Sequence, residues 1–307
     1  MERRDFFHRL GQLTRGVAAG TVLSSALPLL SDEIKTPDIV VAKGSPDTMI
    51  SRLFNELGGI DQYIRPGNTI LLKPNLAFAN APAWGTTTSP ELIKKVAELC
   101  LGAGAKRVIV ADHTNHESEK VFKRTGVGEA LEGLPNVNLV SLDKESMYTE
   151  VTVPYGKALS AVKIAKLVQR ADVLINLPCA KSHTATDISF GLKNLMGLIW
   201  NREYFHNSTD LHAAIAELAV VIRPHLTILD ATRALVTNGP TGPGKVEALN
   251  LFIAGKDPLS VDAYSATLAN WNNRSLTADS IKHLSHAAQI GLGDLDVTKL
   301  KIQKLDS

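Results

Sequence analysis

The sequence predicts an α/β fold in which a largely parallel sheet is flanked by helices, arranged as two intimate lobes. Short apolar runs alternate with helical patterns over most of the 307 residues. The runs are continuously apolar rather than alternating, as is typical of strands that are covered on both faces. Strands that alternate with helices in this way indicate a parallel sheet.

Each expected element follows from its local pattern. Seven apolar runs predict strands at residues 39–41, 69–72, 107–110, 137–140, 173–175, 226–229 and 249–253. Apolar residues at helical spacing predict helices at residues 45–57, 90–102, 161–169, 211–221, 261–269 and 280–289. The second helix has the clearest start, because Ser89, Pro90 and Glu91 offer a cap, a first-turn proline and an acid. Residues 141–160 break the pattern and are expected to form a small antiparallel excursion.

The first residues carry the pattern of an export signal. Arg3 and Arg4 precede two phenylalanines, and the run from Gly16 to Ser31 has no charge. This arrangement predicts a twin-arginine signal, and the run is shorter than the ~20 apolar residues of a membrane span. Export through the twin-arginine translocase to the periplasm is therefore expected, and it favours a metal or redox site because the cargo crosses folded. The alternative is an amphipathic helix with a chance arginine pair.

Composition bounds the domain organisation and the partners. We expect a signal and linker at residues 1–37, an α/β domain at residues 38–300 and a tail at residues 301–307. Removal of residues 1–26 takes away four Lys/Arg and two Asp/Glu, which leaves 29 of each. This neutral balance excludes the basic footprint of a nucleic-acid-binding protein.

Cysteine content limits the cofactors that the chain can hold. Cys100 and Cys179 are its two cysteines, so the chain alone cannot build a four-cysteine iron–sulfur cluster or a zinc ribbon. Cys100 falls in a helical pattern and is expected to be a small buried hydrophobe. Whether the two cysteines pair is left open by the sequence.

Candidate site residues follow the expected strands, where ligands bind in open α/β sheets. Asp112, His113 and His116 lie after the third strand, and their imidazoles and carboxylate suit a metal ion or proton transfer. His113 is the stronger candidate because it is next to the strand end. A solvated loop with a helix cap is the alternative for His116.

A second group of candidates follows the fifth strand. Lys181 and His183 share one loop, and Lys193 and Asn194 come shortly after in a mostly apolar stretch. Burial lowers the pKa of a lysine and makes its amine nucleophilic or able to attract anions. The alternative for Lys193 is a lysine at a helix end whose amine reaches solvent.

A third group follows the second strand. Lys73 and Asn75 flank Pro74, which ends the strand, so the ammonium of Lys73 is available for a carboxylate or phosphate. Thr87 precedes the helix that begins at Pro90, and a helix start can bind an anion. A simple turn and helix caps are the alternatives.

Residues 239–245 have the spacing of a phosphate-binding loop but not its chemistry. Val246 stands where the metal-binding hydroxyl would be, and Pro240 and Pro243 remove backbone donors. A rigid loop over the site is the better interpretation. Asp257 and Asp262 open the next helix, and we expect one of them to cap it and the other to face the cleft.

Several motifs in order resemble the DUF362 family, whose function is unknown. They are residues 70–76, 87–91, 104–110, 181–183, 191–197, 238–240 and 254–258, with Asp262. The resemblance extends from about residue 38 to 295, nearly the whole of the expected domain. Some family members are labelled iron–sulfur proteins, but this chain lacks their cysteine inserts.

A more distant similarity is to the nickel-dependent lactate racemases. It implies a two-lobed α/β fold and a histidine followed ten residues later by a cofactor-tethering lysine, a spacing matched by His183 and Lys193. His113 would be the second base. His206 would stand in for the metal-binding histidine, although it follows Lys193 more closely than in that family. The flanking glycine-rich sequence of the racemases is absent.

These observations lead to one favoured function and two alternatives. The favoured function is an exported metal- or cofactor-dependent enzyme, oxidoreductase or isomerase-like, that acts on a small anion by redox or proton-transfer chemistry. His113, His183 and Lys193 would be catalytic, and Lys73, Asn75, Thr87, Lys181 and Asn194 would bind the substrate. The candidate metal ligands are Asp112, His113, His183 and His206. The alternatives are a periplasmic protein that binds an anion or metal, and an accessory redox or maturation partner of another exported protein.

Overall fold

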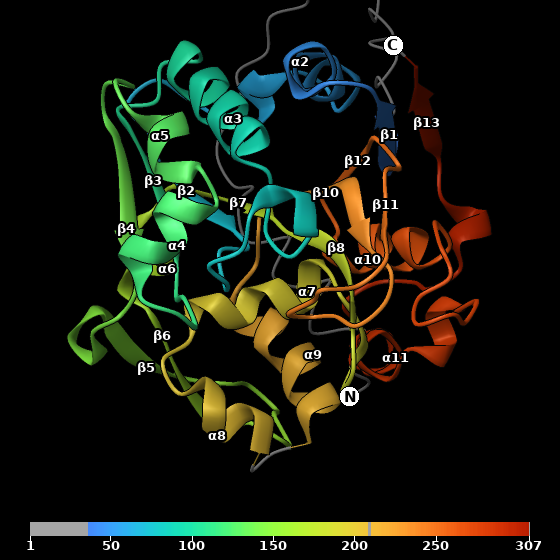
Figure 1. Ribbon diagram of the computed structural model, residues 1–307. Helices are drawn as coiled ribbons and strands as arrows, with labels where there is room; N and C mark the ends of the chain where they lie inside the picture. Colours follow the sequence, from blue (N-terminus) through green and yellow to red (C-terminus); the bar gives the residue numbers. More distant parts are fainter. Residues whose placement is uncertain (1–35, 208–209, 307) are drawn as a thin grey trace, which may run out of the picture. The chain divides into compact units, whose positions relative to one another are not determined.

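The computed structural model describes residues 36–207 and 210–306, so nearly all of the expected signal segment lies outside the described residues (Figure 1). The described residues confirm the expected α/β fold. A mostly parallel sheet runs in the order β13 (Ile302–Leu305), β1 (Ile39–Lys43), β12 (Leu251–Gly255), β10 (Leu226–Leu235), β7 (Val173–Leu177), β2 (Thr69–Pro74), β3 (Arg107–Asp112) and β4 (Val137–Ser141).

Within this order of eight strands, β12 runs against its neighbours. β12 is antiparallel to β1 and β10, whereas β10, β7, β2, β3 and β4 are parallel to one another. Three short strands extend the sheet near β10: β8 (Cys179–His183), β9 (Asp187–Ser189) and β11 (Val246–Glu247). Because β2, β3 and β7 are parallel neighbours, their carboxyl ends meet at one edge.

Alternate residues of each central strand enter two different cores. Ile70 and Leu72 pack on one side of the sheet, and Leu71 packs on the other. The first core contains α2 (Pro46–Glu56), α3 (Pro90–Gly102), α4 (Ser118–Arg124) and α5 (Val127–Leu131). The second contains α7 (Gly191–Asn194), α8 (Arg202–Asn207), α9 (Leu211–Val221), α10 (Pro258–Ala266) and α11 (Lys282–Gln289). The described residues form one compact unit with this sheet at its centre.

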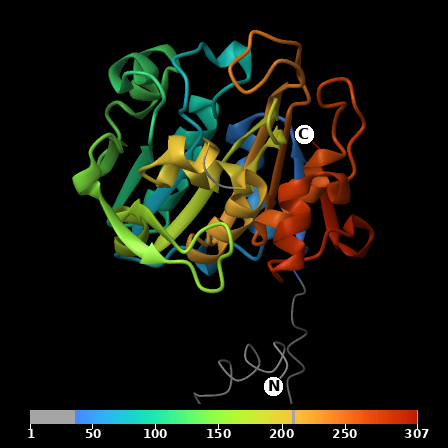
Figure 2. The same ribbon diagram turned by 90° about the horizontal axis from the view of Figure 1, so that it is seen from below.

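The expected helix at residues 161–169 is wrong for most of its length. Its first half is β6 (Ala161–Ala165), and only α6 (Lys166–Arg170) is helical. β6 pairs antiparallel with β5 (Tyr148–Thr152), so the expected antiparallel excursion is a hairpin that extends beyond residue 160. Figure 2 shows this hairpin and the red α11 segment on opposite sides of the molecule. Residues 161–165 form a strand because they pair with β5 along their whole length, so the partner strand decides their conformation.

Two further expectations are corrected by strand pairing. The expected tail at residues 301–307 contains β13, which pairs in parallel with β1 and buries Leu305. Residues 179–183, expected as a loop, form β8, which pairs with β10 and β9. Lys181 and His183 therefore project from a strand, where their backbones are fixed by hydrogen bonds.

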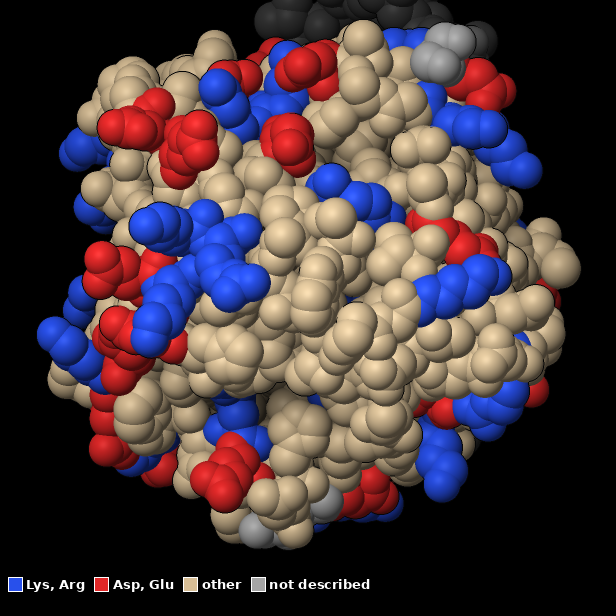
Figure 3. All heavy atoms as spheres, viewed as in Figure 1, with Lys and Arg blue, Asp and Glu red and all other residues tan. Residues whose placement is uncertain are grey.

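Three further expectations from the composition concern the surface charge, the absence of a membrane span and the cysteines. On the face drawn in Figure 3, basic and acidic side chains are interspersed without a field of one sign across it. None of the helices in the described ranges is long and apolar enough to cross a membrane. Cys100 and Cys179 are both buried and unpaired, which confirms the expectation that Cys100 is a core residue.

Candidate functional site

A buried ion pair joins the ends of two neighbouring strands. Lys73 of β2 and Asp112 of β3 have their Nζ and Oδ1 atoms 2.9 Å apart, with side chains 1% and 2% exposed. The carboxylate also accepts hydrogen bonds from the backbone N–H of Leu76 (2.6 Å) and His113 (2.8 Å). Burial lowers the pKa of Lys73, and the charge of Asp112 opposes this shift. The pair is held so completely that Asp112 has little capacity left for a metal ion.

Three asparagines connect this pair to the rest of the site. Asn194 donates from Nδ2 to the carbonyl of Lys73 (3.0 Å) and to Oδ1 of Asn176 (2.8 Å). Its Oδ1 accepts from Nδ2 of Asn75 at 3.0 Å. Asn75 in turn accepts from Nζ of Lys181 at 2.9 Å. Lys73, Asn75, Lys181 and Asn194, all predicted from the sequence, thus lie in one hydrogen-bonded network.

Lys181 is buried between a carbonyl and an aromatic ring. Its Nζ donates to the backbone oxygen of Thr86 at 2.6 Å and lies 5.1 Å from the ring centre of Phe78. Lys181 belongs to β8, and its amine contacts the loop after β2 at Asn75 and Phe78. Burial lowers the pKa of Lys181, because the charged amine has lost most of its water.

Lys193 is buried with a weaker partner. It lies on α7 and is 6% exposed, and its Nζ contacts Sδ of Met196 at 3.5 Å. Burial, followed by the positive charges of Lys181 and Arg202, lowers the pKa of Lys193 to about 7. A large fraction of this amine is therefore uncharged at neutral pH.

The short helix that carries Lys193 is fixed by Asp262. The two carboxylate oxygens of Asp262 accept from the backbone N–H of Gly191 (2.7 Å) and Leu192 (2.8 Å). Burial raises the pKa of Asp262 to about 7. Asp257 caps α10 as expected, by accepting from the backbone of Leu259 and Ser260. The expectation that Asp262 faces the cleft is therefore wrong, because both of its carboxylate oxygens hold the start of α7.

His183 ends β8 beside another imidazole. Its ring is 7% exposed and stacks on His206 with centroids 6.1 Å apart and planes 12° from parallel. Nδ1 accepts the backbone N–H of Ala185 at 3.0 Å, so the neutral ring carries its proton on Nε2. Burial and then the charge of Lys193 lower the pKa of His183 to about 2. His206 is exposed and lies at the rim.

His113 occupies a different environment from His183. Its Nδ1 is 3.2 Å from the carbonyl oxygen of Ile199, and its ring stacks on Trp200 with centroids 5.5 Å apart. Arg202 donates to the carbonyl of His113 at 2.7 Å. Burial lowers the pKa of His113. His113 thus lines the side of the site near Trp200 and Arg202.

The four expected metal ligands do not form one metal site. Asp112 is held by Lys73, His113 packs on Trp200, and His183 faces His206. In the part of the chain that the structure describes, no group of three or more His, Cys, Asp or Glu side chains is arranged to hold a metal ion. The histidines lie in different surroundings, and Asp112 already accepts from Lys73 and from two backbone N–H groups.

Thr87 contributes differently from the expectation. Its hydroxyl is buried and has no hydrogen-bond partner among the described residues. The neighbouring Thr88 instead accepts from the N–H of Asn75 (2.8 Å) and donates to the carbonyl of Leu177 (2.6 Å). Thr88 therefore holds the loop that positions Asn75.

Sequence reasoning missed three contributors. Asn176, Arg202 and Gly197 were not among the candidate site residues. Asn176 had a usable signal, because it is a polar residue at the end of an apolar strand run. Arg202 had no such signal in the sequence, because its guanidinium contacts His113, a residue 89 positions earlier in the chain.

The charges of this cluster do not balance. The charges of Lys181 and Arg202 lower the pKa values of Lys73 and Lys193, and the carboxylate that acts against the shifts of Lys73, Lys181 and Arg202 is Asp112. The charged groups that shift the pKa of Lys193 are Lys181 and Arg202, and both are cations. We call these four side chains with Asp112 the cationic cluster. Buried positive charge without a counterion favours binding of an anion.

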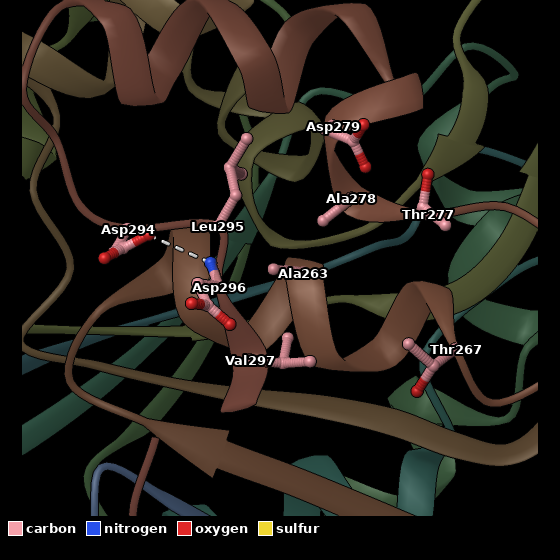
Figure 4. Close-up of a pocket in the computed structure, with 9 residues that line it drawn as sticks. All are labelled: Ala263, Thr267, Thr277, Ala278, Asp279, Asp294, Leu295, Asp296 and Val297. Atoms are coloured by element: carbon pink, nitrogen blue, oxygen red, sulfur yellow. Dashed lines mark hydrogen bonds between the residues drawn. The ribbon is translucent and has the colours of Figure 1, made fainter. Parts of the chain in front are cut away.

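A separate groove has the opposite character. It has a volume of about 420 Å³ and lies between α10 and the segment near Asp294 (Figure 4). Asp279, Asp294 and Asp296 line it, and Oδ1 of Asp294 accepts the N–H of Asp296 at 2.9 Å. Three carboxylates would repel an anion, so this groove does not suit the small anionic substrate expected from the sequence.

Comparisons with known proteins show which sequences and structures this chain is similar to. The model of a domain of unknown function, DUF362, matches residues 70–267, which include most of the residues described above. The chain is 29% identical over 226 residues to the thylakoid-associated protein sll1697 of Synechocystis sp., covering 71% of this chain and 68% of that protein. It is also similar to the lactate racemase apoprotein from Thermoanaerobacterium thermosaccharolyticum, with a TM-score of 0.43 and 14% identity over 71% of this chain. The chain spans 54% of that racemase.

Proposed function

This chain belongs to the DUF362 family, and we propose that it is an enzyme that binds a small anion and transfers a proton. The cationic cluster is the observation that carries this proposal. Its four basic side chains come from β2, β8, α7 and α8, and one carboxylate, Asp112, acts on Lys73, Lys181 and Arg202 but not on Lys193. A carboxylate or phosphate ligand would supply the missing negative charge.

The proton-transfer step is assigned to Lys193 and His183. The amine of Lys193 has a pKa of about 7, which suits a general base or acid near neutral pH. His183 stays neutral, and its Nε2–H is a hydrogen-bond donor beside the amine-bearing helix. Lys181 would hold the anionic group of the substrate, while Asn75 and Asn194 orient that lysine and the loop around it.

A cofactor fits this site only if it is attached through Lys193. The described residues offer two imidazoles, His183 and His206, but no third side-chain ligand near them. The amine of Lys193 has no oxygen partner and is free for covalent attachment. A cofactor held there would supply redox chemistry, and the mass of the intact protein from its native host would show the added group.

We also propose export through the twin-arginine pathway to the periplasm. The supporting observation is the Arg3–Arg4 pair followed by the uncharged run from Gly16 to Ser31. This signal would deliver a protein already folded around its site.

Calorimetric titration tests anion binding. We expect saturable binding of at least one member of a panel of inorganic phosphate, monocarboxylates and dicarboxylates. Lys193→Met should weaken that binding about tenfold at pH 6, where the amine is charged, and less at pH 8.5. Lys123→Met removes an exposed charge from α4 and is the matched control. The absence of saturable binding throughout the panel would refute the proposal.

Hydrogen exchange separates an enzyme from a binding protein. If the proposal holds, a bound carboxylic acid exchanges a carbon-bound proton with deuterated water, which nuclear magnetic resonance detects. His183→Gln should bind the acid yet exchange at least tenfold more slowly. Binding without exchange by the unaltered protein would favour the alternative of a binding protein.

A further inference from the structure

The three buried lysines differ in what their amines contact. Lys73 pairs with a carboxylate at 2.9 Å, and Lys181 donates to two oxygen atoms at 2.6 and 2.9 Å. Lys193 contacts a thioether sulfur at 3.5 Å, which is a weak acceptor. Among the described buried lysines, Lys193 is therefore the one that no oxygen atom holds in the protonated state.

The surroundings of Lys193 also favour the neutral amine. Leu192 and Leu195 are fully buried beside it on the chain. The charged and titratable groups that couple to Lys193 come from three elements: Lys181 and His183 on β8, Arg202 and His206 on α8, and His283 on α11. A lysine among cations and apolar atoms keeps its lone pair free for attack on an electrophile.

We infer that Lys193 is a nucleophile that forms an imine with a small oxo acid. This inference rests on the proposed function, because the cationic cluster must first bind the carboxylate of that acid. The charges of Lys181 and Arg202 reach Lys193, so an oxo acid whose carboxylate these cations attract would arrive in the neighbourhood of the amine.

The step balances without an oxidant or reductant. The nitrogen of Lys193 bonds to the carbonyl carbon, and the carbonyl oxygen takes a proton from the nitrogen to give a carbinolamine. The carbon–oxygen bond then breaks, the hydroxyl leaves as water with the second nitrogen proton, and a carbon–nitrogen double bond forms. His183 keeps its proton on Nε2 and is too weak a base to accept another, so these protons pass between the nitrogen and the oxygen directly or through water. Protonation of the imine acidifies the neighbouring C–H bond, which links this step to proton transfer.

Reduction with sodium borohydride in the presence of pyruvate tests the inference on the full chain. We expect a stable adduct of reduced pyruvate that peptide mass spectrometry maps to Lys193. Lys193→Arg keeps a positive charge but cannot form the imine, so it should bind pyruvate and form no adduct. Before treatment, the intact mass must correspond to unmodified Lys193.

Each outcome decides between the two proposals. Pyruvate binding by calorimetry without an adduct would overturn the imine and leave anion binding standing. An adduct on Lys73 or Lys181 instead, or a group already attached to Lys193, would also overturn it. No binding of pyruvate or of any other tested anion would remove the proposed function itself.

Discussion

At the scale of single residues, the buried ion pair of the site depends on a neighbour without a side chain. The backbone of Gly197 lies against Lys73 and Asp112. A Cβ atom at this position would lie 1.9 Å from Oδ1 of Asp112 and 2.6 Å from Nζ of Lys73. Both atoms are buried and held by further hydrogen bonds, so they have little room to move.

Gly197→Ala should therefore destabilise the protein by about 3 kcal/mol, because the methyl group separates a buried charge from its partner. Denaturant unfolding followed by circular dichroism measures the change. Gly102→Ala is the matched control, since no atom lies within 4 Å of its added Cβ at the end of α3. That control should be neutral or stabilise by about 0.5–1 kcal/mol. Equal stability of both variants would contradict the close contact.

The pH dependence of stability gives a second prediction, for Lys193. Its folded pKa is about 7, below the ordinary lysine value of 10.5. Between these values the unfolded chain holds a proton that the folded protein lacks, so this group makes stability rise with pH in that window. Each pKa unit corresponds to about 1.4 kcal/mol.

Lys193→Met should consequently raise the free energy of unfolding by a few kcal/mol at pH 6. The gain should shrink as the pH rises from 7 towards 10.5 and vanish above that value, where the lysine is neutral in both states. Unfolding curves at several pH values, without added anions, provide the measurement. Lys123→Met should show no such trend, and a gain that is independent of pH would argue against a charge effect.

At the scale of elements, the hairpin of β5 and β6 is fastened by one carboxylate. Glu217 of α9 is buried and accepts hydrogen bonds from the backbone N–H of Lys157, Ala158 and Leu159, at 2.7 to 3.2 Å. These residues connect the two strands. A charged acceptor with several N–H donors contributes more than a neutral one.

Glu217→Gln should loosen this connection, because the amide replaces one accepting oxygen with a donor. We expect at least tenfold faster amide hydrogen exchange within the hairpin and a loss of about 2 kcal/mol in stability. Glu150→Gln changes an exposed carboxylate on β5 and serves as the control. Unchanged exchange in Glu217→Gln would show that strand pairing alone holds the hairpin.

Prediction from sequence succeeded where one element decided its own conformation. Helix α3 begins at Pro90, as its proline and acid indicate, and β2 begins at Thr69. The cap expected of Ser89 is absent, since its N–H binds Asp230 across the fold and its hydroxyl makes no cap bond. β6 and β13 were missed because their conformations depend on pairing with other strands, with β5 in a hairpin and with β1 across the whole chain.

The candidate site shows the same limit. Lys73, Asn75, Lys181 and Asn194 follow strands that meet at one edge of the sheet, and a topological rule found them together. Side-chain packing decides that Lys73 contacts the carboxylate of Asp112, whereas Lys193 contacts the thioether of Met196. The spacing of residues in the sequence does not predict this difference.

At the scale of the whole molecule, the charge of the site differs from that of the surface in view. Basic and acidic groups are mixed on the face seen in Figure 3, whereas Asp112 is the carboxylate that acts on the buried Lys73 and on Arg202. Anion capture would therefore depend on the interior of the site, and it should be less sensitive to salt than attraction by a charged surface.

We expect export of the whole chain to depend on Arg3 and Arg4. Arg3→Lys combined with Arg4→Lys keeps the charge but removes the arginine pair that the twin-arginine exporter reads. In a bacterium with this pathway, the full chain carrying a C-terminal epitope should reach the periplasm. The paired variant should instead remain in the cytoplasm at precursor mass.

The matched control is Arg9→Lys combined with Arg15→Lys, which makes the same chemical change away from the pair. Cell fractionation with immunoblotting should find this control exported as the unaltered chain is, because its arginine pair is intact. Equal distribution of all three proteins would mean that the pair is not read. In that case the basic residues before Gly16 would belong to an ordinary amphipathic segment, the alternative that the sequence left open.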